Sequence, residues 1–163
     1  MTISFPLRTL TAAAASLCVA AASADVLVDS PGPTSLDSIA DGSFITVGID
    51  GSFSQVLGVV ATNSAAKTWD SLYSWSDSIV YLTNATFTGF DLQAHDTSTI
   101  NYSGGFNPDL SVATFDDASF NMSGGTLGFL GSGGGTGFGG TVTVSGGTVA
   151  QGVACAGGAV FIT

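Results

Sequence analysis

A short pattern recurs at a nearly constant interval and limits the folds open to this chain. INYSGG, FNMSGG and VTVSGG start at Ile100, Phe120 and Val142, and a weaker copy, VYLTNA, starts at Val80. The first and third positions of every copy are apolar or aromatic, and the fourth is a hydroxyl residue. Alternation with a period of two marks a strand with one buried face. The pattern therefore predicts a strand that is repeated along the chain.

Corners are predicted on both sides of this strand. A glycine pair follows it in three copies, and glycine, which lacks a Cβ atom, adopts positive φ at little cost. Aspartate precedes it in His95-Asp96-Thr97 and, at the same place of the next copy, in Phe115-Asp116-Asp117. Aspartate at such a place accepts hydrogen bonds from backbone amides and tolerates unusual backbone angles.

The interval favours a parallel β-solenoid with turns of about 20 residues, because a propeller blade needs about 40. Stacked turns would place Ile100 over Phe120 in the core, with polar ladders of Asn101 over Asn121 and Ser103 over Ser123. The amino-acid composition also indicates an all-β fold, since the chain has twelve Asp, no Glu and only two Lys or Arg, a poor set of helix formers. A β-sandwich, which spaces its strands by about 8–12 residues, is the alternative.

Three segments are expected along the chain. Residues 1–24 read as a signal peptide, residues 25–77 as a degenerate or capping β region, and residues 78–163 as the solenoid repeats with a glycine-rich insertion at 131–140. The irregular N-terminal half suits the atypical cap with which a solenoid closes its open end.

The signal peptide is predicted from three features of the N-terminus. Arg8 is followed by a small and apolar run, Leu10 to Ala22, and Ala22-Ser23-Ala24 matches an A-x-A cleavage site before Asp25. The run is too short to span a bilayer, so we expect a secreted or cell-surface protein without a membrane span in the mature chain.

The acidic net charge of the chain limits the classes of partner that it can bind. Cleavage would remove Arg8 and leave Lys67 as the one cation against twelve aspartates, a formal charge of −11. Nucleic acid is excluded as a partner, because phosphate binding needs clustered Lys or Arg.

The C-terminal region raises two further expectations. The final strand, GAVFIT (158–163), is apolar and without a polar cap, which invites edge pairing and self-association, or indicates an incomplete reading frame. Cys155, the one cysteine after the signal segment, is expected to be an inert core residue, with intermolecular pairing as the alternative.

The repeats INYSGG, FNMSGG and VTVSGG resemble the N-x-S-G-G-type repeats of secreted bacterial β-solenoid (β-helix) proteins, such as autotransporter passengers and planctomycete-type surface proteins. The resemblance covers about residues 78–150. It implies an extracellular or cell-surface protein with a structural or adhesin-like role. We expect the chain to differ from these proteins in being short and without a C-terminal barrel, anchor helix or sorting tail.

Trp69, Tyr73 and Trp75 are the candidate ligand-contact residues, because clustered aromatic faces with polar edges suit a carbohydrate or another surface protein. The alternative is that these rings fill the core beneath a cap or a long loop.

A polysaccharide-active β-helix enzyme, a hydrolase or a lyase, is the alternative from another functional class. Glycoside hydrolysis needs paired carboxylates, and Asp96, Asp116 and Asp117 would lie close together on adjacent turns beside His95. The competing interpretation is that these aspartates cap the turn before each strand, and it is preferred because a lyase would also need basic groups. No catalytic residue is therefore assigned.

No cofactor or metal site is predicted. The glycine runs hold none of the aspartates of a G-G-x-G-x-D calcium repeat, and His95 alone cannot build a transition-metal site.

Overall fold

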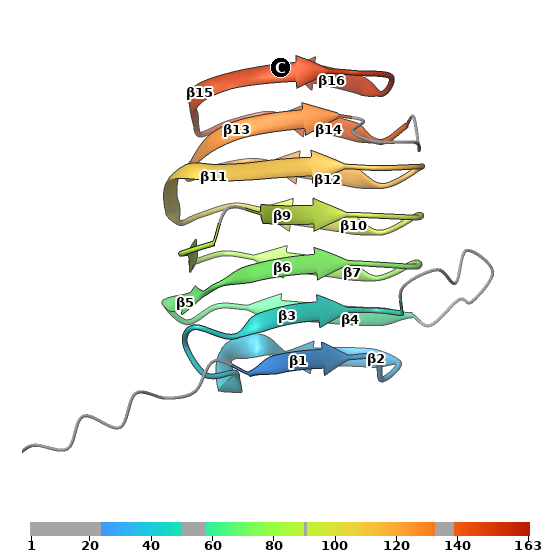
Figure 1. The fold of residues 1–163 in the computed structure, drawn as a ribbon, viewed down its shortest axis with the longest axis vertical. Coiled ribbons are helices and arrows are strands. Elements are labelled where there is room, and N and C mark those ends of the chain that lie inside the picture. The colour runs from blue at the N-terminus through green and yellow to red at the C-terminus, as the bar shows by residue number, and fades with distance from the viewer. Residues whose placement is uncertain (1–23, 50–57, 90, 133–138) are drawn as a thin grey trace, which may run out of the picture.

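The computed structural model is a stack of strands that winds through about six turns (Figure 1). It describes residues 24–49, 58–89, 91–132 and 139–163, so the predicted signal segment and most of the glycine-rich insertion lie outside the described residues. Helix accounts for only 2% of the structure, and every strand pairing among the described residues is parallel. The prediction of an all-β parallel solenoid is confirmed, in place of the sandwich alternative.

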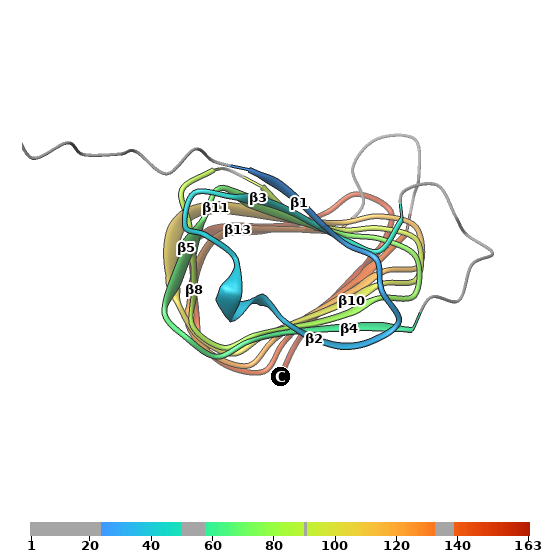
Figure 2. The same cartoon turned by 90° about the horizontal axis from the view of Figure 1, so that it is seen from below.

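Two seven-stranded sheets form the long faces of the solenoid, and a narrower third face joins them (Figure 2). Sheet A consists, in spatial order, of β1 (Asp25–Val28), β3 (Phe44–Val47), β6 (Ser71–Ser74), β9 (Asp91–Ala94), β11 (Phe106–Thr114), β13 (Thr126–Ser132) and β15 (Thr148–Cys155). Sheet B consists of β2 (Gly32–Ser35), β4 (Val59–Asn63), β7 (Ile79–Leu82), β10 (Thr99–Tyr102), β12 (Ser119–Met122), β14 (Thr141–Val144) and β16 (Ala159–Ile162). The third face contains a two-stranded sheet of β5 (Lys67–Trp69) and β8 (Ala85–Phe87).

The repeated pattern forms sheet B in the register that the sequence predicts. Ile100 pairs with Phe120, and Asn101 with Asn121, whose side-chain amide donates to Asn101 Oδ1 at 3.1 Å. The first-column residues are fully buried, and the asparagines are partly exposed on the outer face. Burial of a side chain such as Phe120 stabilises the fold by about 1.5–3 kcal/mol, so each turn adds one apolar layer to a continuous core.

Both predicted kinds of corner are present. Asp96 and Asp116 have φ of 59° and 55° in the turns that lead from sheet A to sheet B, and Ser76 has 58° at the equivalent place one turn earlier. After the sheet B strand, Gly105 and Gly125 have φ of 124° and 80°. Aspartate and glycine therefore occupy the corners because they tolerate this backbone conformation.

The N-terminal end of the solenoid is closed by a short 3-10 helix, η1 (Leu36–Ser38). Leu36 is fully buried, and Figure 2, which looks along the solenoid from this end, shows η1 lying across the interior. Asp37 fixes η1 to the next turn, because its carboxylate accepts hydrogen bonds from the backbone amides of Ser64 and Ala65 at 2.9 and 3.0 Å. Lys67 Nζ adds a bond to the Ile39 carbonyl oxygen at 2.9 Å.

In the part of the chain that the structure describes, no helix has the length and apolar character needed to cross a bilayer.

Candidate functional site

The three predicted ligand-contact residues separate into two environments. Trp69 is fully buried on the third face, with its ring centroid 6.1 Å from that of Phe87, so it packs in the core as the alternative interpretation describes. Tyr73 and Trp75 are partly exposed on the outer face of sheet A, because β6 turns alternate residues outward. The structure thus brings Tyr73 and Trp75 together and keeps Trp69 apart from them.

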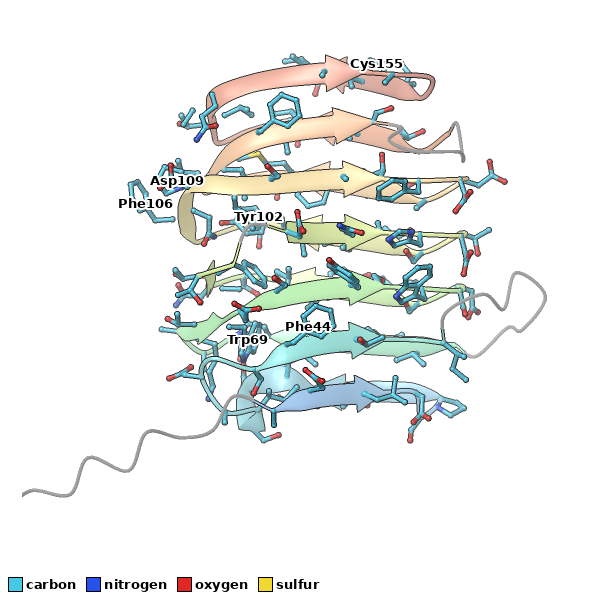
Figure 3. The ribbon with its side chains drawn as sticks, viewed as in Figure 1. Phe44, Trp69, Tyr102, Phe106, Asp109 and Cys155 are labelled. Carbon is cyan, nitrogen blue, oxygen red and sulfur yellow. The ribbon has the colours of Figure 1, made fainter. Side chains whose placement is uncertain are left out.

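Tyr73 and Trp75 belong to a row of ring side chains that crosses four turns. We call this row the outer aromatic strip: Phe44, Tyr73, Trp75, His95 and Phe115. All five are partly exposed, and Phe44 projects from the outside of β3 in Figure 3. Trp75, His95 and Phe115 line up because each is the residue that follows its sheet A strand, whereas Phe44 and Tyr73 lie within β3 and β6.

Neighbouring rings of the outer aromatic strip pack against each other in two ways. His95 is stacked between Trp75 and Phe115, with centroid separations of 3.8 and 4.4 Å and interplanar angles of 11° and 5°. Phe44 and Tyr73 meet edge to face at 4.8 Å and 76°. The stacked rings cover each other's faces, so this part of the strip offers ring edges and polar tips to a partner.

Polar groups lie against the rings. His95 Nε2 is 2.9 Å from Gln93 Oε1, and Gln93 Nε2 donates to the Tyr73 hydroxyl at 3.4 Å. Partial burial raises the pKa of Tyr73, and the negative charge of Asp91, its hydrogen bond and the charge of Asp70 raise it further. Tyr73 therefore keeps its hydroxyl proton, and the strip combines apolar rings with donors and acceptors.

An open depression adjoins the strip at Phe44. It is lined by Asp25, Val26, Leu27, Phe44 and Thr46, between the first two strands of sheet A. Leu27 is 57% exposed, which is high for an apolar side chain of this size. The strip and the depression together form a mixed apolar and acidic surface on one face of the molecule.

The aspartates of the enzyme alternative lie on adjacent turns, as expected, but the two at the corner are engaged by backbone amides. Asp96 is buried and its Oδ2 accepts from Ser76 N at 2.9 Å, while Asp116 Oδ2 accepts from Asp96 N at 3.4 Å. Asp117 is exposed. This geometry is that of turn caps, which the competing interpretation describes.

The described residues hold no group of three or more His, Cys, Asp or Glu side chains that could bind a metal ion.

The expectation that Cys155 is a core residue is wrong. Its position in β15 faces the core by register, since it pairs with the buried Ser132, but no described turn lies beyond it and the side chain is exposed (Figure 3).

Sequence reasoning missed Phe44 and the stacking of Trp75, His95 and Phe115. The signal for the stack was present, because Trp75-Ser76-Asp77 stands one repeat before His95-Asp96-Thr97 and two repeats before Phe115-Asp116-Asp117. Phe44 could not be found by this spacing, since β3 pairs with β6, which begins only at Ser71, well beyond the regular interval.

The chain matches no protein-family model, and no curated protein or solved structure is significantly similar to it.

Proposed function

We propose that this chain is an exported β-solenoid that acts outside the cell or on its surface, in a structural or adhesive role and without catalysis. The observation that carries the proposal is the outer aromatic strip, a row of rings on a flat, hydrogen-bonded face. The signal-peptide features of residues 1–24 and the resemblance of the repeats to secreted bacterial β-solenoid proteins support the location.

The strip suits a carbohydrate or another surface protein as its partner. Tyr73 and Trp75 supply apolar area at low conformational cost, and Asp91 and Gln93 supply hydrogen-bonding groups beside the rings. Nucleic acid is disfavoured by the acidic charge of the chain.

The hydrogen bonds that the candidate acids accept support the absence of catalysis. Hydrolysis needs one carboxyl to donate a proton and a second to activate water or attack the sugar. Asp96 and Asp116 instead accept backbone amide hydrogen bonds across turns, which favours a structural role for both carboxylates.

Binding to immobilised polysaccharides and to intact cell surfaces tests the adhesive role. A Tyr73→Ala/Trp75→Ala variant should lose at least about tenfold in affinity, the loss typical of a buried aromatic contact. Tyr81→Ala is the matched control, because Tyr81 is 45% exposed on the opposite sheet. Equal binding by both variants would count against the strip as the contact surface.

Export and catalysis need separate measurements. Export predicts that a secreting host releases a chain whose first residue is Asp25, and retention of the intact chain in the cell would contradict it. A polysaccharide depolymerase activity that disappears in the Asp96→Asn/Asp116→Asn/Asp117→Asn variant would overturn the non-catalytic proposal.

A further inference from the structure

Two carboxylates lie beside Tyr73, the ring of the outer aromatic strip that contacts both Phe44 and His95. Asp70 directly precedes β6, and Asp91 begins β9 in the next turn. The Tyr73 hydroxyl donates a hydrogen bond to Asp91, and partial burial and the negative charges of Asp91 and Asp70 together raise the pKa of Tyr73. Both carboxylates therefore act on the same hydroxyl, and we call Asp70 and Asp91 the strip carboxylates.

No lysine or arginine among the described residues neutralises the strip carboxylates. Lys67 is the one such residue in the part of the chain that the structure describes, and its Nζ donates to the Ile39 carbonyl oxygen at 2.9 Å, beside the N-terminal cap. His95, the base within the strip, has its Nε2 atom 2.9 Å from Gln93 Oε1. The negative charge beside Tyr73 is therefore open to a positively charged partner, and the acidic net charge of the chain draws such partners toward it.

The rings next to the strip carboxylates attract the same kind of ligand. The face of an aromatic ring carries negative potential, so it attracts a cation, as a carboxylate does. Phe44 and Tyr73 meet edge to face at 76°, so at least one of these two rings keeps both faces clear of the other. The part of the strip around Tyr73 therefore combines ring surface and carboxylates in one place, which suits a ligand with both apolar groups and positive charge.

The position of the strip on the face of sheet A favours a sugar polymer over a basic peptide. The backbone groups of β3, β6 and β9 already pair with one another, and a peptide that adds a strand needs an open sheet edge, which a sheet face does not provide. A sugar polymer binds through side chains alone, with C–H groups on the rings and hydroxyls on Gln93 and the Tyr73 hydroxyl. The strip crosses four turns, a span of about 14 Å at about 4.8 Å per turn, so successive sugars can lie along it.

We infer that the outer aromatic strip and the strip carboxylates bind a polymer of amino sugars whose nitrogen atoms carry positive charge. The ammonium groups of the polymer lie against Asp70 and Asp91, and its sugar rings lie on Tyr73 and Trp75. This inference rests on the function proposed above, because it names the class of carbohydrate that the same surface binds. A basic protein as the partner is the alternative that the experiment separates from it.

Calorimetric titration of the purified chain with two oligomers of equal length tests the inference. One is made of glucosamine and the other of N-acetylglucosamine, so the second lacks the positive charge; at about pH 6 the free amines of the first are protonated. Wild type should bind the glucosamine oligomer at least about tenfold more tightly, because each of the two exposed or partly exposed carboxylates contributes about three- to fivefold. Added salt should reduce this preference, since it screens exposed charges.

Three variants separate the effect of charge from that of the rings. Asp91→Asn removes one charge but keeps an oxygen that accepts from the Tyr73 hydroxyl, so it should lower the preference for the glucosamine oligomer at least about threefold and leave the affinity for the acetylated oligomer unchanged. Asp109→Asn is the matched control, because Asp109 is exposed on β11 and lies well apart from Phe44 (Figure 3); it should keep the wild-type preference. Tyr73→Ala should weaken the binding of both oligomers.

The outcomes distinguish a failure of this inference from a failure of the proposed function. Equal wild-type affinity for the two oligomers, or a preference that Asp91→Asn leaves unchanged, would overturn the inference, and the adhesive role would stand if binding still depends on Tyr73. Binding of neither oligomer would also overturn it, whereas the proposed function fails only if binding to cell surfaces is equally independent of Tyr73 and Trp75. Binding of poly-lysine but not of the glucosamine oligomer would replace the amino-sugar polymer with a basic protein.

Discussion

Among the buried polar residues, Asn107 should be the one whose substitution destabilises the fold most. It is almost fully buried at the start of β11, and its side chain joins three groups: Nδ2 donates to Ala85 O and to the Tyr102 hydroxyl, both at 2.9 Å, and Oδ1 accepts from Phe87 N at 2.6 Å. Two of these partners are backbone groups of β8, so Asn107 links two turns where the third face bends toward sheet A.

We predict that Asn107→Leu destabilises the fold by about 2–5 kcal/mol. Each of the two backbone groups left unpaired costs about 1–3 kcal/mol, and the lost bond to Tyr102 adds about 1 kcal/mol. Burial of the leucine side chain offsets roughly 1–2 kcal/mol of this. At about 3 °C per kcal/mol for a chain of this length, the melting temperature should fall by roughly 6–15 °C.

Equilibrium urea unfolding, followed by far-ultraviolet circular dichroism, measures the change. Asn101→Leu is the control, because Asn101 is partly exposed on sheet B and has one side-chain bond, from Asn121. It should change the free energy of unfolding by less than about 1 kcal/mol. Equal effects of the two substitutions would refute the reasoning that the buried amide satisfies the backbone of the third face.

Two further changes test the N-terminal cap and the glycine corners. Four hydrogen bonds, led by that from the Ser64 hydroxyl, lower the pKa of Asp37 from 3.8 to about 2, so its stabilisation is complete above pH 3.8 and is lost as the pH falls through about 2. Thermal melts over a pH series should show a lower melting temperature for Asp37→Asn near neutral pH and no difference from wild type below about pH 2; a difference that persists there contradicts the assignment. Gly125→Ala should destabilise by more than about 2 kcal/mol, since φ is +80° and a Cβ atom would lie 2.7 Å from the Tyr102 ring and 2.9 Å from Gly105 O. Gly58→Ala, with φ of +58° and open space around it, should cost only about 1–2 kcal/mol in the same chemical denaturation, and a larger cost than that of Gly125→Ala would contradict the steric argument.

The sequence was sufficient to predict the register of sheet B and the chemistry of its corners. Ile100, Phe120 and their neighbours repeat at a fixed spacing, and a one-residue shift would turn the buried face outward, so only one register is compatible with the pattern. Unusual backbone angles at Asp96 and Asp116 could also be predicted, because an aspartate recurs at this place just before the sheet B strand.

The rest of the molecule could not be predicted because the turns differ in length. β11 and β13 pair with a register shift, between Asn107 and Ser111 on one strand and Leu127 and Phe129 on the other. The contact between Asp37 and Ser64 joins two turns, and no repeat marks either residue. Periodicity identifies residues that share a position in equal turns, so it misses the hydrogen bonds of the cap, Phe44 and the role of Asn107.

Five of the twelve aspartates share one structural role, which explains how so acidic a chain can stack its turns with so few cations. Backbone amides of a neighbouring turn donate to the carboxylates of Asp37, Asp41, Asp77, Asp96 and Asp116. A hydrogen bond to a charged acceptor is stronger than one between neutral groups, and it needs no lysine or arginine. Aspartate reaches the adjacent backbone with one rotatable bond fewer than glutamate, so less conformational entropy is lost when it is fixed. This accounts for aspartate in place of glutamate at these five positions. These five carboxylates therefore join the earlier turns to one another, whereas the later turns are joined by apolar side chains, backbone bonds and neutral donors such as Gln151, whose side-chain amide donates to Pro108 O and Asp109 Oδ1.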